Sequence, residues 1–242
     1  MIRAVFFDAA GTLFDSREPI GRTYARVARA HGLDAPEEAV ADAFRRAFQD
    51  APELAFGRGH SSAELRRLER NWWRERVAET FAPLGQFPDF DAYFDALFAY
   101  FAEPAHWHVF PEGEPALRRL KECGVKLGVI SNFDYRVYRI LEGLGLAQHF
   151  DSITISSEAG RAKPHREIFE VAMSRQGVAP AEAMHVGDSE RLDFSAALGA
   201  GMAAVLIDRE NGLDEVETTG EAAARVSSLA DLPELCQLFR SA

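Results

Sequence analysis

Two carboxylates of this sequence stand almost directly after short apolar runs. Asp8 follows residues 4–7, and Asp188 follows residues 183–186 after a single glycine. Mg²⁺ takes oxygen ligands, usually one or two carboxylates together with water and substrate oxygens. It also neutralises charge that otherwise makes a phosphate dianion repel a carboxylate nucleophile. The pair therefore indicates a magnesium-dependent phosphoryl-transfer site in which Asp8 is placed to be the nucleophile.

Two more groups extend this candidate metal site. The backbone carbonyl of Ala10 is expected to point toward the metal in the turn that follows Asp8. Asp193 comes five residues after Asp188, at the start of an expected helix, from which it can reach a metal-bound water. A carboxylate in the first turn also stabilises a helix by itself, so Asp193 has a purely structural alternative.

Lys163 and the pair Ser131 and Asn132 supply groups for a phosphate. Lys163 stands in a loop just before an expected helix, and it is one of only three lysines in the sequence. Its ammonium can offset the charge of Asp8 and of a phosphate, and the alternative is a solvated loop lysine. Ser131 and Asn132 follow a third apolar run, residues 125–130, and are able to hold phosphate or metal.

These groups need a sheet whose strands end at one edge. The runs predicted as strands are residues 4–7, 125–130, 183–186 and 203–207, and the helical patterns beside them are residues 114–121, 135–144, 165–176 and 192–200. Strands that alternate with helices of this length form βαβ units, so the fold class is α/β with a parallel sheet. Ligands bind outside the carboxyl ends of such strands, which brings the polar residues together.

Residues 17–105 interrupt this alternation. They show apolar residues at helical spacing, prolines between the segments and no strand pattern. We expect an all-helical insertion at 17–105 between two parts of one core domain, residues 1–16 and 106–242. A helix-like segment, residues 230–239, closes the chain.

Composition excludes several classes of function. The 242 residues carry 27 Lys and Arg against 38 Asp and Glu, a net charge of -11. This balance argues against non-specific nucleic-acid binding and against a polybasic membrane surface. No run approaches the roughly 20 apolar residues of a membrane span. Cys123 and Cys236 lack a metal-ligand spacing and are expected to be reduced thiols, so a cytoplasmic protein is predicted, with its oligomeric state open.

Four separated motifs resemble those of the haloacid dehalogenase superfamily. They are Asp8 to Leu13 (DAAGTL), Val129 to Asn132 (VISN), Lys163 with Pro164, and Val186 to Ser189 (VGDS) with Asp193. The resemblance implies a three-layer, Rossmann-like core with a helical cap inserted after the first motif. It also implies that Asp8 attacks phosphorus and forms an aspartyl-phosphate, which water hydrolyses.

The resemblance assigns the remaining roles by position. Ser131 hydrogen-bonds the transferring phosphoryl group, Asn132 lies beside it at the substrate, and Lys163 neutralises charge. Asp188 and Asp193 hold Mg²⁺ together with Asp8 and the carbonyl of Ala10. The expected partner is a small phosphorylated substrate, because a cap of this size favours small molecules.

Ala10 departs from the pattern of the superfamily's phosphatases. They usually carry a second Asp two residues after the nucleophile, which protonates the leaving alcohol and then activates water. Such a general acid and base is worth about 10²–10⁴-fold. Its absence leaves three alternatives: a substrate with a good leaving group such as an aryl or acyl phosphate, a substitute group from the cap such as His60, or a weak or inactive hydrolase kept as a binding protein.

Two other reactions of the superfamily fit the sequence less well. Phosphonoacetaldehyde hydrolases also have Ala at this position but need a cap lysine, and residues 17–105 contain none. Haloacid dehalogenases attack carbon, need no metal and lack the acidic group of Asp188. The sequence therefore predicts a Mg²⁺-dependent phosphatase, with a non-catalytic binding protein as the alternative and a dehalogenase as the weaker one. Arg17, Arg22, Arg58 and Trp107 are possible substrate contacts, and Trp72 and Trp73 are expected in the cap core or in a cap-to-cap contact.

Overall fold

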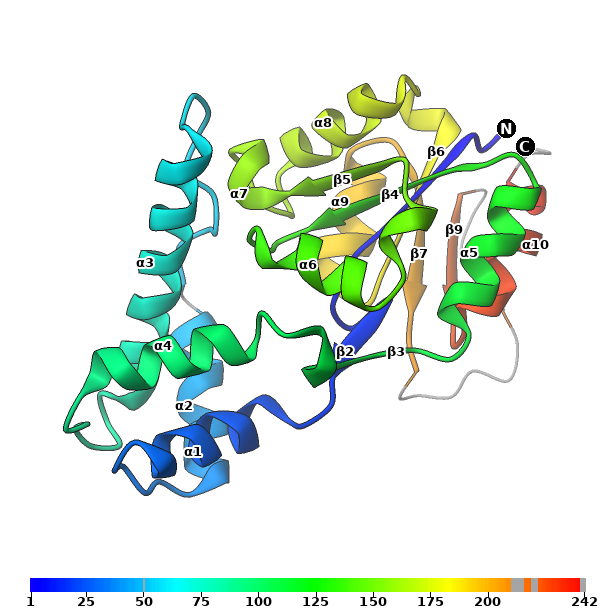
Figure 1. Ribbon diagram of the computed structural model, residues 1–242. Coiled ribbons are helices and arrows are strands. Elements are labelled where there is room, and N and C mark those ends of the chain that lie inside the picture. Colours follow the sequence, from blue (N-terminus) through cyan, green and yellow to red (C-terminus); the bar gives the residue numbers. More distant parts are fainter. Residues whose placement is uncertain (50, 210–215, 219–221, 240–242) are drawn as a thin grey trace.

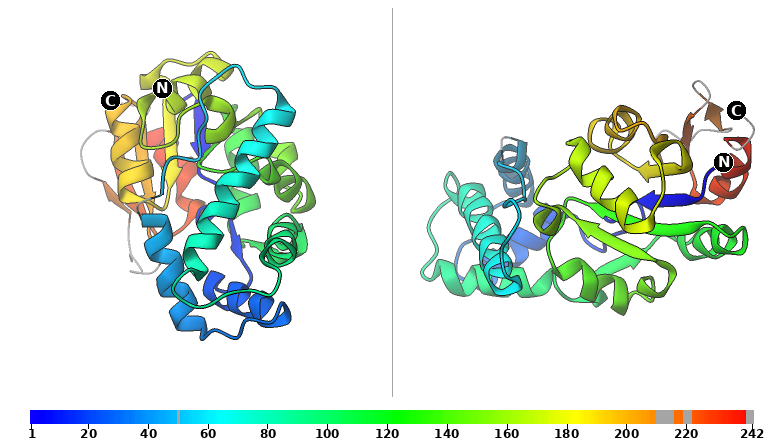
Figure 2. Two further views of the ribbon diagram at one scale, coloured as in Figure 1. Left: turned by 90° about the vertical axis from the view of Figure 1, so that its left-hand side faces the viewer. Right: turned by 90° about the horizontal axis from the view of Figure 1, so that it is seen from above.

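The computed structural model describes residues 1–49, 51–209, 216–218 and 222–239. Figure 1 shows two parts: a sheet with helices on both of its faces, called here the sheet domain, and a group of four helices, called here the helical block. The helical block lies beside the sheet domain in all views (Figures 1 and 2). None of the described helices is both long and apolar enough to cross a membrane.

The sheet has seven strands in the order β5-β4-β1-β6-β7-β9-β8, all parallel except β8. Their bounds are β1 (Ala4–Phe7), β4 (Lys126–Ser131), β5 (Ser152–Ile155), β6 (Ala183–Gly187), β7 (Ala203–Ile207), β8 (Glu217–Thr218) and β9 (Ala223–Val226). Phe7 pairs with Val129 of β4 and with Val186 of β6. Three neighbouring strands therefore end side by side, as the sequence predicted.

Both faces of the central strand β1 are covered, because its four side chains are fully buried. Val5 and Phe7 join the apolar cluster of one helical layer, and Ala4 and Phe6 join the cluster of the other. The first layer holds α5 (Gly113–Glu122), α6 (Arg136–Gly143) and α10 (Leu232–Leu238), and the second holds α8 (Arg166–Gln176) and α9 (Ser195–Gly199). The core is therefore the three-layer α/β fold that the sequence predicted.

The helical block consists of α1 (Ile20–Ala30), α2 (Glu37–Gln49), α3 (Ser62–Phe81) and α4 (Phe90–Tyr100). It has its own aromatic core, in which Tyr93 stacks on Phe87 and meets Phe81 edge-on. Ser61 and Glu64 form a capping box at the start of α3. The described residues of this stretch contain no strand. The division into domains at residues 16 and 105 stays a prediction.

A short antiparallel ribbon connects the two parts. It pairs β2 (Phe14–Ser16) with β3 (Trp107–Val109), so the chain leaves the sheet domain and returns to it at the same place. The remaining short helices are α7 (Ser156–Ala159), η1 (Pro104–His106), η2 (Ala147–His149), η3 (Pro180–Glu182), η4 (Glu190–Phe194) and η5 (Leu229–Asp231).

The structure differs from the sequence-based elements in a few places. Strands β2, β3, β5, β8 and β9 were not predicted. β5 is a short mixture of polar and apolar residues, and two of the four residues of β9 are alanine, a poor strand former. The helix expected at 192–200 is a π-helical turn, η4, followed by α9. α8 begins at Arg166, one residue after the expected start of that helix, and ends at Gln176 as expected.

Candidate active site

Lys163 lies between two carboxylates at the carboxyl edge of the sheet. Its Nζ is 2.8 Å from Oδ1 of Asp8 and 2.6 Å from Oδ1 of Asp193, and its side chain is 2% exposed. Burial alone lowers the pKa of Lys163, but the charges of Asp193 and Asp8 outweigh it and hold the pKa above its ordinary value. Burial likewise raises the pKa of Asp193, yet the ammonium of Lys163 keeps it low. Lys163 is therefore a cation and Asp193 an anion at neutral pH.

His185 shares the Asp193 oxygen that Lys163 contacts. Its Nε2 is 2.8 Å from Oδ1 of Asp193, and the backbone N–H of Ser189 donates to Oδ2 at 3.1 Å. His185 is buried in β6, where Phe169 packs edge-on against its ring. Protein donors thus reach both oxygens of Asp193, so this carboxylate fixes the position of Lys163. Sequence analysis missed His185, although it is the one titratable residue within the apolar run of residues 183–186.

Three carboxylates meet at this edge, as expected for a metal site. Asp8, Asp188 and Asp193 each place one oxygen within 4.8 Å of the others. Removal from water, and then the charges of Asp8 and Asp193, raise the pKa of Asp188 to about 6, and a hydrogen bond from Thr12 works against this rise. A cation among these oxygens relieves the repulsion, and an all-oxygen set suits Mg²⁺. The residues therefore fit the metal that the sequence predicted.

The loop after Asp8 approaches Asp188 closely because residue 11 is glycine. Gly11 has φ 83°, and a Cβ on it would lie 2.6 Å from Oδ2 of Asp188. Arg209 donates to the carbonyls of Gly11 at 2.8 Å and of Thr12 at 2.9 Å and pairs with Glu112. Arg209 braces this loop and was not found from the sequence, because Gly11 lies 198 positions away along the chain.

Ser131 and Asn132 both line the site but use their side chains differently. Ser131 ends β4, is buried and is one of the residues that line the cavity described below. The side-chain amide of Asn132 donates to the carbonyl of Lys163 at 2.9 Å and accepts from its N–H at 2.7 Å. Asn132 therefore holds the loop that carries Lys163, and the substrate contact expected of it stays a prediction.

A cavity of about 320 Å³ lies over these groups, between the sheet domain and the helical block. Its floor, formed by the sheet domain at the strand ends, is Asp8, Ala10, Ser131, Asn132, Lys163, Asp188, Ser189 and Asp193. Its roof, formed by the helical block and the first residue after it, is Ile20, Tyr24, Phe44, Trp73, Val77, Phe94, Leu97, Phe98 and Phe101. The remaining lining is Asp15, Ser16, Trp107, Phe133, Arg136 and Leu192. Every described roof residue is uncharged, whereas the floor carries one ammonium and three carboxylates.

A buried ion pair joins the roof to the sheet domain. Arg136 of α6 donates from Nε and Nη2 to the two oxygens of Asp134 at 2.8 and 2.6 Å. Trp73 of α3 donates from Nε1 to the same carboxylate at 2.6 Å. The Arg136 guanidinium also lies over the ring of Phe98, 3.8 Å from its centroid. Trp73 was expected in the cap core or in a cap-to-cap contact. Its ring does pack against the core of the helical block, and its N–H in addition binds the sheet domain.

Glu69 of α3 is a second buried group at this boundary. Its Oε1 accepts from the N–H of Tyr135 at 3.3 Å, while its Oε2 has no hydrogen-bond partner among the described residues. Burial, and to a smaller extent the charge of Asp134, raises the pKa of Glu69 to about 7, although a hydrogen bond from Ser157 opposes the rise. Glu69 therefore binds a proton more tightly in the folded protein than in a solvated chain.

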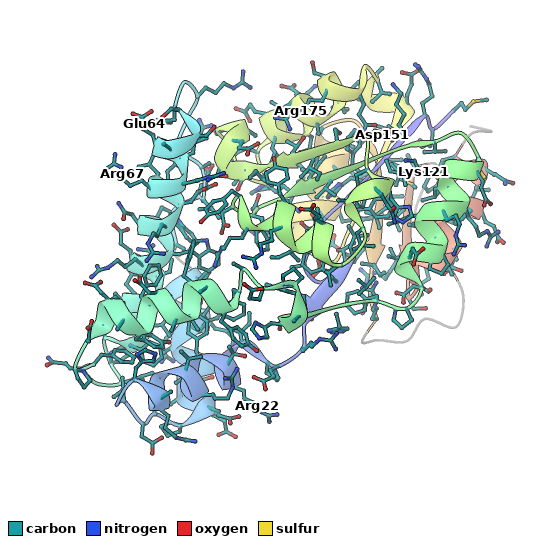
Figure 3. The ribbon with its side chains drawn as sticks, viewed as in Figure 1. Arg22, Glu64, Arg67, Lys121, Asp151 and Arg175 are labelled. Carbon is teal, nitrogen blue, oxygen red and sulfur yellow. The ribbon has the colours of Figure 1, made fainter. Side chains whose placement is uncertain are left out.

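The cationic residues considered as substrate contacts lie away from the cavity. Arg17, Arg22, Arg58 and His60 do not line it, whereas Trp107 does. Arg22 is at the outer edge of the helical block (Figure 3) and pairs there with Glu37. His60 is exposed, with its Nε2 2.8 Å from the carbonyl of Phe56. His60 is thus not positioned to replace the missing acid in this structure.

The chain resembles known proteins in sequence and in fold. Residues 2–201 match the family of haloacid dehalogenase-like hydrolases. The haloacid dehalogenase-like hydrolase domain-containing protein 3 of Mus musculus is 37% identical over 220 residues, which cover 88% of this chain and 84% of that protein. The phosphoserine phosphatase of Thermus thermophilus is 36% identical over 135 residues, which cover 55% of this chain and 53% of that protein.

A solved structure shows the same fold over almost all of the chain. The L-2-haloacid dehalogenase from Xanthobacter autotrophicus superposes with a TM-score of 0.69 at 22% identity, covering 98% of this chain and 99% of that one. At that identity the likeness establishes the fold, and the reaction has to be argued from the groups in the site.

Proposed function

Because the chain belongs to the haloacid dehalogenase-like hydrolase family, we propose that it is a Mg²⁺-dependent phosphatase of a small phosphorylated molecule. Asp8 is the nucleophile and becomes an aspartyl-phosphate. The observation that carries the proposal is the position of Lys163, whose ammonium is 2.8 Å from Oδ1 of Asp8. A buried cation at that point offsets charge on the nucleophile and on an arriving phosphate dianion.

The residues of the floor divide the work of the reaction. Asp8 attacks phosphorus, and Lys163 and the hydroxyl of Ser131 are placed to bind the phosphoryl oxygens as charge shifts between them. Asp193, His185 and Asn132 keep Lys163 in place. Asp8, Asp188, Asp193 and the carbonyl of Ala10 would hold Mg²⁺, which supplies charge neutralisation and orients the phosphate. The roof keeps bulk water from the reacting atoms.

The acidic floor also separates this proposal from dehalogenation. Attack on carbon creates no need for a divalent cation, and two further carboxylates crowded against the nucleophile, Asp188 and Asp193, then raise the energy of the site without a function. A second candidate remains, a non-catalytic binding protein, and Ala10 favours it. The cavity contains no described histidine, and Asp15 is the only carboxylate of its lining outside the acidic floor.

Phosphate release and intact mass test the proposal together. The protein is incubated with Mg²⁺ and acetyl phosphate, and we expect turnover that EDTA stops, together with a transient mass increase of one phosphoryl group. Asp8→Asn should remove both, a loss of at least about 10³-fold in turnover. Asp34→Asn is the control, since it removes an exposed carboxylate that does not line the cavity. If no phosphorylated compound gives either turnover or a phosphorylated chain, the phosphatase proposal is wrong and the binding protein is the remaining candidate.

A further inference from the structure

The roof of the cavity selects against polar substrates. Six of its nine residues are aromatic and the other three are aliphatic: Tyr24, Phe44, Trp73, Phe94, Phe98 and Phe101, with Ile20, Val77 and Leu97. A hydroxyl-rich group such as a sugar loses its water there without gaining enough partners, at a cost of roughly 1–3 kcal/mol for each unpaired polar group. An aromatic ring instead gains contacts with the apolar side chains of the roof.

The cavity also lacks a free cation for a second anionic group. The described residues of its lining include two cations, Arg136 and Lys163. Nε and Nη2 of Arg136 donate to the buried carboxylate of Asp134, and its Nη1 donates to the carbonyl of Phe98. Lys163 is held by Asp8 and Asp193 at the phosphate position. A carboxylate elsewhere on the substrate would therefore be desolvated without a counter-charge, which disfavours phosphorylated hydroxy acids and amino acids.

Because position 10 lacks an acid, the leaving group has to be stable enough to leave without being protonated. An alkyl alcohol has a pKa close to that of water, about 15.7, and has to be protonated as it leaves. A phenol has a pKa of about 10, the value of a tyrosine side chain, and can leave as the anion. Ala10 and the aromatic roof thus favour the same group, although they lie in different parts of the molecule.

The size of the cavity limits the ring system. An engineered apolar cavity of about 150 Å³ is known to hold a benzene molecule. The cavity here, about 320 Å³, has to take the phosphate as well. One aromatic ring with small substituents fits these limits.

We propose that the site hydrolyses aryl phosphate monoesters, in which a single neutral aromatic ring is bonded to the phosphoester oxygen. This inference rests on the proposed phosphatase function and names its substrate class. Oδ of Asp8 forms a bond to phosphorus, the bond from phosphorus to the aryl oxygen breaks, and the aryl oxide leaves with the electron pair. Water then attacks phosphorus and the carboxylate of Asp8 leaves; one proton of the water stays on the phosphate formed and the other goes to solvent.

A substrate panel tests the choice of substrate. Phenyl phosphate is compared with propyl phosphate, phosphoserine and glucose 6-phosphate, with acetyl phosphate as a ring-free reference. We expect kcat/KM for phenyl phosphate to exceed that for propyl phosphate by at least about 10²-fold. We also expect a burst of phenol, because release of the phosphate from Asp8 is slowed by the missing base. Equal or better turnover of phosphoserine or glucose 6-phosphate overturns the inference, while failure of acetyl phosphate as well points to the proposed function itself.

Restoring the acid tests the demand on the leaving group. In single turnovers, Ala10→Asp should raise the rate at which propyl phosphate phosphorylates Asp8 at least about 10-fold. The rate with phenyl phosphate should rise much less. An equal gain for the two substrates would show that the leaving group is protonated by another residue and would overturn this part of the inference. Single turnovers are used because the new carboxylate also speeds the second step.

A change in the roof tests the ring site. Leu97→Asn puts a polar group into the middle of the roof, but Leu97 is also part of the buried core of the helical block. Ile20→Asn is the safer variant, since Ile20 is 37% exposed at the edge of the cavity. We expect it to raise KM for phenyl phosphate about 5-fold with kcat unchanged, and to leave phosphorylation by acetyl phosphate unaltered.

Leu198→Asn is the matched control for this variant. Leu198 is similarly exposed, at 39%, and lies outside the lining of the cavity. Leu198→Asn should change neither KM for phenyl phosphate nor phosphorylation by acetyl phosphate. If Ile20→Asn and Leu198→Asn have the same effect on phenyl phosphate, the ring is not bound by the roof.

Discussion

The floor and the roof of the cavity are built on opposite principles. The floor holds charged groups that are fixed by ion pairs and hydrogen bonds, such as Lys163 between Asp8 and Asp193. The roof holds apolar side chains that contact one another through their surfaces, such as Phe94 and Phe98. In the proposed function this difference divides the roles: the charged floor determines which bond is broken, and the apolar roof determines which molecule binds above it.

The largest effect should come from removing the cation of the floor. Lys163→Met leaves Asp8 and Asp193 without their shared partner, so we expect turnover to fall at least about 10³-fold. The free energy of unfolding should fall by about 3 kcal/mol, because carboxylates stay buried without a counter-charge. Lys121→Met, at an exposed position, is the control and should change stability by no more than about 0.5 kcal/mol. Unaltered turnover in Lys163→Met would show that the floor does not work through charge.

Removing a carboxylate from the floor should abolish the response to metal. At a Mg²⁺ concentration of about 100 times Kd, binding adds about 2.7 kcal/mol to the stability of the folded protein. Asp188→Asn should lose most of this gain in thermal unfolding with Mg²⁺ against EDTA. Asp15→Asn should keep it, since Asp15 lies outside the acidic cluster. A gain that survives in Asp188→Asn would place the metal elsewhere.

The boundary between the two regions should respond to pH through Glu69. Its pKa rises from 4.5 to about 7 on folding, so the folded protein binds the extra proton between these values. The contribution of Glu69 to stability is complete below pH 4.5 and is lost as pH rises through 7. Glu69→Gln should therefore be more stable than the parent at pH 8 by about 1 kcal/mol, allowing for screening, and should flatten the profile from pH 5 to 8. Urea titrations across this pH range measure the free energy of unfolding of both proteins. Parallel pH profiles of that free energy would contradict the prediction.

The smallest effect should come from the charged outer surface of the helical block. Arg22→Ala removes one exposed ion pair, with Glu37, which is worth about 0.5 kcal/mol or less. KM for any phosphorylated substrate should not change. A rise in KM would mean that the helical block binds substrate through charge, which is the opposite of what its apolar roof indicates.

The sequence allowed the floor to be predicted in more detail than the roof. Asp8, Ser131 and Asp188 follow strand runs, and parallel strands end at one edge, so their meeting follows from the pattern alone. The roof depends on which side of each amphipathic helix faces the sheet domain. Phe94 and Phe98 line the cavity and also belong to the block's own core, whereas Tyr93 belongs to that core and does not line the cavity. No spacing in the sequence separates these cases.

The supporting residues were missed for a related reason. His185 and Arg209 are recognised only through partners that are remote along the chain or that lie on another element, such as Asp193 for the first and Gly11 for the second. Conversely, Asn132 was expected at the substrate because of its type, and the structure shows its amide bound to the Lys163 backbone. Residue type indicates which chemistry is available, and only the fold shows which partner takes it up.

The place of β1 has a consequence for how the protein is made. β1 is the first strand along the chain but lies in the middle of the sheet, between β4 and β6. These partners begin at Lys126 and Ala183, so the buried segment Ala4–Phe7 waits on the order of ten seconds of ribosomal synthesis before it can pair. During that time it is an exposed apolar strand, which is a risk of aggregation. The carboxylate of Asp8, at the end of β1, meets Lys163 and Asp193 only after most of the sheet has been translated, so the proposed activity requires β1 to be paired with both β4 and β6.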